Sequence, residues 1–423
     1  MGNAGFTEVT RLSTARERLA ERCEPHDRTE RRSPADAVGH VLASDVQAVR
    51  PVPHYDRAAM DGYAVRATDT FGATERSPAR LERAEGSVNA GTAVPVNTGS
   101  AVPDGADAVV MVEETERRGE SLLVYDAVAE SGNIAPAGED VEASQHLFDA
   151  GHRLTPSDVA LLRAAGCEAV PIREQPRVSV LPTGEELVDP GDSPGPGEII
   201  ETNGLLVSSL VTQWGGVPSY RDIVTDEEDA LRTAIEADLD HDVIVTTGGS
   251  SVGERDLVPD VVDDIGEVLV HGISLKPGHP VGFGVVDGTP VLLLPGYPVS
   301  CLVTAVQLLR TALAWLAGTE PQPQPTTRAT LSRKLPSGPG ERTFARVRID
   351  DGESTEEGED GAEATVSPVR TGGAGVMSSV AFADGWVEIP ESREGIPAGE
   401  TVTVQQWERP VFPEGSAGTP SWE

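Results

Sequence analysis

Apolar and polar residues follow three different patterns along this chain of 423 residues. From about 51 to 146, short apolar runs are separated by Gly, Pro, Asn and Asp, which is typical of an all-β segment. From 177 to 317, apolar runs such as DVIVTTGG alternate with segments of helical period, which predicts a parallel sheet with helices on both faces. From 328 to 407, strand-like runs return, which predicts a small β-barrel or sandwich.

Capping residues mark where helices should begin and end. The clearest helix is 155–166, where Thr155 is a candidate N-cap, Pro156 occupies the first turn and Gly166 ends the helix. A helix followed by a strand is predicted over 33–49.

Three further helices are expected. The segment 10–22 is short and polar, and Asp226 is positioned to start another helix. The most apolar stretch, 299–317, still contains Gln307 and Arg310, so we expect a core helix rather than a membrane span.

The helical flanks of the β-rich insert suggest one discontinuous domain that carries an inserted β domain. A Pro-rich linker then precedes the last β segment. The expected domains are 1–50 with 147–176 (N-terminal and linker), 51–146 (inserted β), 177–318 (α/β) and 328–411 (C-terminal β).

Acidic residues outnumber basic ones by 69 to 33, so the formal net charge is −36. A chain this acidic repels nucleic acid and anionic lipid, and neither is expected as a partner. Because the acids are spread along the chain, we favour a solvated shell adapted to a high-salt cytoplasm over an acid-rich binding tail.

The three cysteines, Cys23, Cys167 and Cys301, form no Cys-x-x-Cys pair. Structural thiols in a reducing compartment are therefore expected. The first residues, MGNAGFTEVTRL, lack the apolar run of a secretory signal, so a cytoplasmic location is the expectation.

Three loops should lie at the carboxyl ends of the parallel strands, where such sheets bind ligands. These loops are TGEE (183–186), TGGSSVGERD (247–256) and PGYPVS (295–300). Glycines in the second loop allow backbone N–H groups to converge on an anion, although a simple tight turn is the alternative.

Carboxylates also gather near these loops. Glu186, Asp226 and Asp256 each lie at a strand end or helix start of the predicted sheet. Hard oxygen ligands beside an anion-binding turn suit Mg²⁺ held on a phosphate, whereas a helix N-cap is the alternative for Asp256.

Lysine is almost absent. Only Lys276 and Lys334 occur, and the other 31 fixed cations are arginines. A lysine retained in SLKPGHPVGFG therefore suggests a task that suits a compact ammonium, such as neutralising an oxyanion, and a surface lysine is the alternative.

Seven segments in this order resemble the molybdopterin molybdenumtransferase family, which includes MoeA and the E domain of gephyrin. They are YDRAAMDGYAV, VNTGSAVPDGADAVVMVEE, GNIAPAGED, TGEEL, TTGGSSVGERD, LKPGHPVGFG and PGYPVS. The resemblance covers about residues 7–407. It implies a multidomain α/β plus β fold, with a central doubly wound parallel-sheet domain of the molybdopterin-binding type, an inserted β domain and a C-terminal β-barrel.

The resemblance also implies a reaction and an assembly. Adenylylated molybdopterin (molybdopterin-AMP) is hydrolysed with Mg²⁺, molybdate is ligated by the dithiolene, and molybdenum cofactor and AMP are released. The family acts as an elongated homodimer whose active site combines segments of both subunits.

Family positions carry over to this sequence residue by residue. The implied catalytic residues are Asp61, Asp140, Asp256 and Lys276, and the implied metal ligands are Asp226 and Asp256. The implied substrate-binding residues are Thr98, Glu186, Gly248, Gly249, Ser250, Ser251, Gly253, Ser300 and Ser378, with Arg346 and Ser379 matched more loosely.

The sequence departs from the family pattern at three positions. Ala135 stands where an arginine usually follows Asn-Ile, His279 where a second lysine is common, and Tyr297 where asparagine is usual. Three alternatives stay open: a tungstate-specific paralogue, a molybdopterin adenylyltransferase and a non-catalytic scaffold. The adenylyltransferase is an alternative because that family shares the fold of the 177–317 module.

Overall fold

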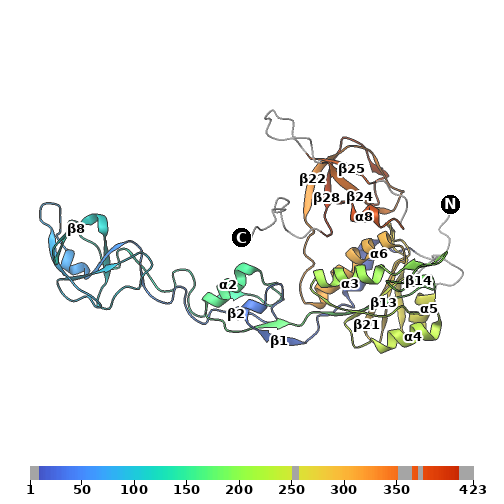
Figure 1. Ribbon diagram of the computed structural model, residues 1–423, viewed down its shortest axis with the longest axis horizontal. Coiled ribbons are helices and arrows are strands. Elements are labelled where there is room, and N and C mark those ends of the chain that lie inside the picture. The colour runs from blue at the N-terminus through green and yellow to red at the C-terminus, as the bar shows by residue number, and fades with distance from the viewer. Residues whose placement is uncertain (1–8, 250–256, 351–363, 370–374, 409–423) are drawn as a thin grey trace. The chain divides into compact units, whose positions relative to one another are not determined.

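The computed structural model describes residues 9–249, 257–350, 364–369 and 375–408 (Figure 1). These residues form two compact units. Unit 1 comprises 1–28 and 173–423, and unit 2 comprises 29–172.

A six-stranded sheet forms the centre of the α/β part of unit 1. Its strand order is β16-β13-β17-β21-β20-β18. The strands are β13 (Arg177–Pro182), β16 (Val217–Tyr220), β17 (Val243–Thr247), β18 (Glu267–His271), β20 (Gly282–Val286) and β21 (Thr289–Leu294).

This sheet is mixed rather than wholly parallel. Strands β16, β13, β17 and β21 are parallel, whereas β20 is antiparallel to both β21 and β18. Asp287 and Gly288 connect β20 to β21 with positive φ values of 49° and 87°. An Asp-Gly turn of this kind joins antiparallel neighbours, so the local turn decides the strand direction.

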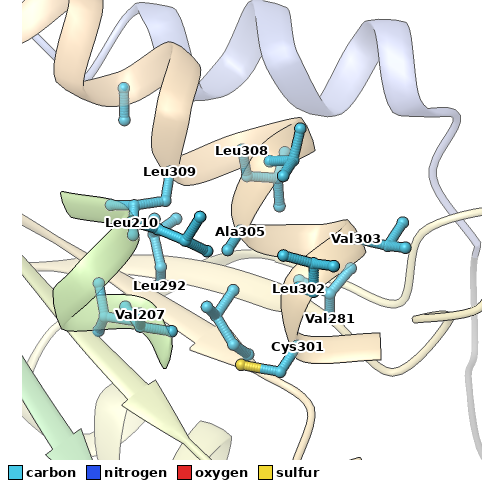
Figure 2. Close-up of a cluster of buried hydrophobic side chains, with 14 of the residues drawn as sticks. Val207, Leu210, Val281, Leu292, Cys301, Leu302, Val303, Ala305, Leu308 and Leu309 are labelled. Carbon is cyan, nitrogen blue, oxygen red and sulfur yellow. The ribbon is translucent and has the colours of Figure 1, made fainter. Parts of the chain in front are cut away.

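Helices cover both faces of the sheet (Figure 1). Core contacts place α3 (Asn203–Gln213) and α6 (Pro298–Thr304) on one face, and α4 (Glu228–Ala237) and α5 (Leu257–Ile265) on the other. Figure 2 shows the first interface, in which Val207 and Leu210 of α3 face the side chains of α6 and of the following turn. The predicted doubly wound domain is therefore confirmed.

The apolar run 299–317 forms α6, a π-helical turn η4 (Ala305–Leu309) and α7 (Arg310–Leu316). It is long and apolar enough to cross a membrane, but 89% of its most apolar window is buried inside the protein. This packing agrees with the predicted core helix. Helix α1 (Leu12–Ala20) packs on α7, so residues 9–28 belong to unit 1 and not with 29–50.

The C-terminal strands close into a barrel. Five of them follow the order β24-β25-β22-β28-β26, and a β24–β26 pairing closes the ring. Strand β19 extends the sheet beside β24. The barrel part comprises β19 (Leu275–Lys276), β22 (Thr326–Leu331), β23 (Leu335–Pro336), β24 (Arg342–Asp350), β25 (Thr365–Pro368), α8 (Ser378–Ala381), β26 (Gly385–Ile389), β27 (Gly395–Ile396) and β28 (Thr401–Gln405).

Aromatic side chains join the barrel to the α/β part. Trp386 packs on Phe344 and stacks on Trp407 with ring centroids 4.5 Å apart, and all three belong to the same core cluster as α3 and α6. This shared apolar core is why the two parts form one unit.

Unit 2 holds a second six-stranded sheet, in the order β7-β4-β6-β5-β9-β8. Its strands are β4 (Gly62–Val65), β5 (Ala79–Arg83), β6 (Thr92–Val96), β7 (Ala108–Met111), β8 (Thr115–Arg118) and β9 (Ser121–Val124). The rest comprises β1 (Thr29–Arg32), β2 (Val46–Gln47), β3 (Arg57–Ala58), β10 (Ile134–Ala135), β11 (His146–Phe148), β12 (Val170–Arg173), the turns η1 (Pro34–Asp36), η2 (Ala67–Thr70) and η3 (Val112–Glu114), and α2 (Pro156–Ala164).

The structure confirms the capping argument at α2, where Thr155 accepts a hydrogen bond from the Asp158 N–H in a capping box. Two other helix predictions are confirmed only in part. Residues 33–49 do form a helix and then a strand, with Ser33 at the N-cap, but the helix is the short 3-10 turn η1 and the strand is the two-residue β2; the chain turns at Gly39 with φ 81°. The helix predicted after Asp226 is α4, but it begins at Glu228 with Glu227 at the N-cap, so Asp226 does not start it.

Candidate active site

A crevice is expected where a doubly wound sheet reverses its strand order. In unit 1 the chain runs from β13 to the edge strand β16 and then returns to β17 on the other side of β13. The reversal places the 183–186 and 247–249 segments side by side at the carboxyl ends of β13 and β17.

Two glycines allow close packing there. At Gly248 an added Cβ would lie 2.1 Å from the Thr183 carbonyl oxygen, and at Gly249 it would lie 2.4 Å from a Val258 methyl. Both have positive φ, 132° and 63°. The loop therefore depends on glycine at both positions.

Carboxylates border this crevice. The Thr183 hydroxyl donates a 2.6 Å hydrogen bond to the Asp226 carboxylate, which is held beside the end of β13. The exposed Glu186 carboxylate lies over Gly184, where an added Cβ would be 2.8 Å from it. The structure thus brings Glu186, Asp226, Gly248 and Gly249 to one edge of the sheet.

Four predicted residues of the same loop, Ser250, Ser251, Gly253 and Asp256, lie outside the described residues. Their placement, including the predicted metal role of Asp256, stays a prediction.

A cavity of about 530 Å³ opens between the α/β part and the barrel of unit 1. Lys276, His279, Tyr297 and Ser300 line one wall, and Arg346 lines the other. The cavity is linked to the crevice by the 295–300 loop, because Gly296 lies against Gly248.

Arg346 is buried, and its Nε has no hydrogen-bond partner in the described part of the chain. Burial lowers the pKa of its guanidinium. A buried N–H without an acceptor is costly, and an oxyanion in the cavity would supply the missing acceptor.

Lys276 has a partner that the sequence did not reveal. Its ammonium lies 2.6 Å from the Glu341 carboxylate, and the lysine side chain is 56% exposed. The pairing of β19 with β24 explains this contact. It places Leu275 opposite Arg342 and Lys276 opposite Thr343, so Glu341 lies next to the paired residues. An anion bound at this wall would therefore compete with Glu341 for the Lys276 ammonium.

The predicted residue Ser378 is exposed at the start of α8 and is not among the cavity-lining residues. Its neighbour Ser379 is buried and donates its hydroxyl hydrogen bond to the Val376 carbonyl.

The remaining predicted residues lie in unit 2. The Asp61 carboxylate accepts hydrogen bonds from the Thr98 N–H at 2.6 Å and from its hydroxyl at 2.9 Å, and both bonds lower the pKa of Asp61. Asp140 is exposed, and its backbone N–H donates to the Val52 carbonyl. The structure therefore joins Asp61 to Thr98 and holds Asp140 on a neighbouring loop.

The donor set of the crevice fits Mg²⁺. Asp226 and Glu186 provide hard carboxylate oxygens, few in number, as expected for an ion that keeps water and phosphate ligands. Among the described residues, the two tight Asp/His groups lie elsewhere, at Asp45–His146–Asp149 and Asp238–Asp240–His241.

Three family models match consecutive parts of the chain. They are the MoeA N-terminal region (domains I and II) at residues 10–166, the probable molybdopterin binding domain at 179–315 and the MoeA C-terminal region (domain IV) at 328–407.

Similar proteins cover nearly the whole chain. A relative from Methanocaldococcus jannaschii is 32% identical over 398 residues, 92% of this chain and 94% of its own. Molybdopterin molybdenumtransferase 2 of Mycobacterium tuberculosis is 33% identical over 87% of this chain and 92% of its own. The crystal structure of a molybdopterin biosynthesis MoeA protein from Pyrococcus horikoshii matches with a TM-score of 0.81 and 33% identity, covering 95% of this chain and 100% of that one. The chain belongs to the MoeA family of molybdopterin molybdenumtransferases.

Proposed function

We propose that this protein hydrolyses adenylylated molybdopterin and inserts molybdate into the dithiolene, releasing molybdenum cofactor and AMP. The observation that carries the proposal is the proximity in unit 1 of two features, joined where Gly296 lies against Gly248. One is the glycine loop beside Asp226 and Glu186, and the other is a cavity lined by Lys276 and the buried Arg346.

The crevice suits the phosphoanhydride. Gly248 and Gly249 let the loop pack closely against Thr183 and Val258 with its backbone uncovered by side chains of its own, and Thr183 orients the Asp226 carboxylate. Asp226 and Glu186 would hold Mg²⁺, which lowers the charge on the phosphoanhydride when bound. The catalytic roles of Asp256, Asp61 and Asp140 rest on the resemblance.

The cavity suits a small oxyanion. Arg346 presents a guanidinium with an unsatisfied N–H, Ser300 lies at the start of α6, and Lys276 contributes a compact ammonium. Molybdate, a dianion, matches this set of donors. Tungstate has the same charge and shape, so it serves as the second arm of the test.

We further propose a homodimer in a cytoplasm of high salt, with no nucleic acid or membrane partner. The three free cysteines of the chain are buried, which is consistent with a reducing compartment. Light scattering in molar KCl tests the dimer, and a species near 44 kDa alone would refute it.

The test of function is to incubate the purified protein with adenylylated molybdopterin, Mg²⁺ and either molybdate or tungstate. AMP release and cofactor formation are measured, with samples lacking Mg²⁺ or oxyanion as controls. Formation of cofactor with molybdate supports the proposal. Absence of AMP release from folded protein under all conditions would refute it and favour a scaffold.

A further inference from the structure

Asn203 places a buried amide at the first position of α3, where the residue is 7% exposed. Its Nδ2 donates a 2.6 Å hydrogen bond to the Gly296 carbonyl. Its Oδ1 is also buried and finds no hydrogen-bond partner among the residues that the structure describes. A buried polar atom without a partner lowers the stability of a protein, so folding alone does not explain an asparagine at this position.

The start of α3 is firmly anchored. The Glu201 carboxylate accepts a 2.7 Å hydrogen bond from the Gly204 N–H, and the Tyr220 hydroxyl donates to the same carboxylate. Gly204 also lets the helix pack closely on the ends of β13 and β16, since an added Cβ would lie 2.9 Å from Pro182 and 2.5 Å from the Tyr220 ring. Asn203 therefore extends from a well-supported position, as a residue that positions others requires.

The hydrogen-bond partner of Asn203 lies where the crevice and the cavity meet. An added Cβ at Gly296 would lie 3.5 Å from the Gly248 Cα, so the two glycines are in contact distance. The same loop supplies Tyr297 and Ser300 to the cavity wall. The amide of Asn203 thus holds the loop at the point that touches both features.

We propose that Asn203 is a positioning residue. Its amide holds Gly296 beside Gly248 and thereby sets the place of the cavity wall relative to the phosphate crevice. This inference rests on the proposed function, because it concerns the same reaction. The alternative is that the hydrogen bond serves folding only, in which case stability and activity should fall together when it is removed.

Asn203→Leu separates these alternatives, because leucine has a similar volume and cannot donate a hydrogen bond. The substitution also removes the unpartnered Oδ1, so the melting temperature should stay within about 4 °C of the parent value. Molybdenum insertion should nevertheless fall about 100-fold, the cost of misplacing reacting groups by about 1 Å. Asn203→Ala gives the same test if the leucine variant folds poorly. Insertion at the parent rate in either folded variant would overturn the inference.

Binding and rate should also separate. The 183–186 and 247–249 segments follow β13 and β17, whose pairing does not involve Asn203. Equilibrium dialysis without molybdate should therefore give a parent-like affinity of Asn203→Leu for adenylylated molybdopterin. Loss of rate without loss of affinity is expected for a group that acts only on the reacting geometry. An affinity that falls by the same factor as the rate would show that the crevice itself is disrupted, and would contradict the proposal.

Gln213→Leu is the matched control. Gln213 is the last residue of α3, and its side-chain amide also donates to a distant backbone carbonyl, that of Glu408 at 3.3 Å, but the contact is exposed. The substitution is the same, amide to leucine, on the same helix. Gln213→Leu should insert molybdenum at the parent rate, and a loss equal to that of Asn203→Leu would refute a specific role of Asn203.

Amide hydrogen exchange keeps this inference separate from the proposed function, because it needs no substrate. Peptides that cover 295–301 include the Cys301 N–H, which donates to the Tyr297 carbonyl at 2.9 Å. Their exchange should be about 10-fold faster in Asn203→Leu than in the parent or in Gln213→Leu. If the parent forms no cofactor but this difference is seen, the proposed function fails and Asn203 still positions the loop. Unchanged exchange would overturn the inference whatever the activity.

Discussion

Replacing Gly248 by alanine tests whether the crevice is built from glycine backbone. The added Cβ would lie 2.1 Å from the Thr183 carbonyl oxygen, whereas an ordinary contact begins near 3.4 Å, so the two strands must separate by about 1.3 Å. The φ of 132° adds strain of its own.

Gly288→Ala is the matched control. Its φ is also positive, 87°, but an added Cβ meets nothing within 4 Å. We expect about 1–2 kcal/mol of destabilisation for the control from backbone strain alone. For Gly248→Ala we expect a further ~1–3 kcal/mol from overpacking.

The displacement should also affect catalysis. Thr183 orients Asp226, so moving Thr183 by about 1 Å should misplace that carboxylate and cost roughly 100-fold in AMP release. Urea unfolding in molar KCl and AMP release at several Mg²⁺ concentrations measure both effects. Equal stability and equal activity of Gly248→Ala and Gly288→Ala would refute the contact argument.

Three other predictions follow from charge. Lys276→Ala should lower AMP release about 100- to 1000-fold without unfolding the protein, and Lys276→Arg should restore it only in part; parent-like AMP release from Lys276→Ala would make the lysine a surface residue. Thr98→Val removes one of the two hydrogen bonds that lower the pKa of Asp61, so NMR titration should show that pKa rising part of the way toward its ordinary value. The stabilising effect of those bonds is present when Asp61 is ionised and fades as the pH falls through its lowered pKa, and an unchanged titration would contradict the assignment. With a net charge of −36, the melting temperature should fall as KCl is diluted, and a flat or rising temperature would contradict salt adaptation.

The sequence predicts the layered part of the fold well, because strand and helix periods are strong where apolar runs are long. It predicts the doubly wound sheet and helix α2 with its cap. It misses the antiparallel β20 and β18, although the Asp287-Gly288 pair was the available signal.

The predicted site is recovered less completely, because side-chain partners distant in sequence leave no local pattern. The Lys276–Glu341 ion pair and the Thr183–Asp226 hydrogen bond arise from strand pairings that no spacing reveals.

A single-turnover experiment tests the central claim most directly. Protein, adenylylated molybdopterin, Mg²⁺ and limiting molybdate are mixed, and released AMP and dithiolene-bound molybdenum are quantified in the same samples. We predict AMP release together with molybdenum insertion in the parent, and loss of both in Gly248→Ala but not in Gly288→Ala. Molybdenum insertion at the parent rate in a folded Gly248→Ala protein would contradict it.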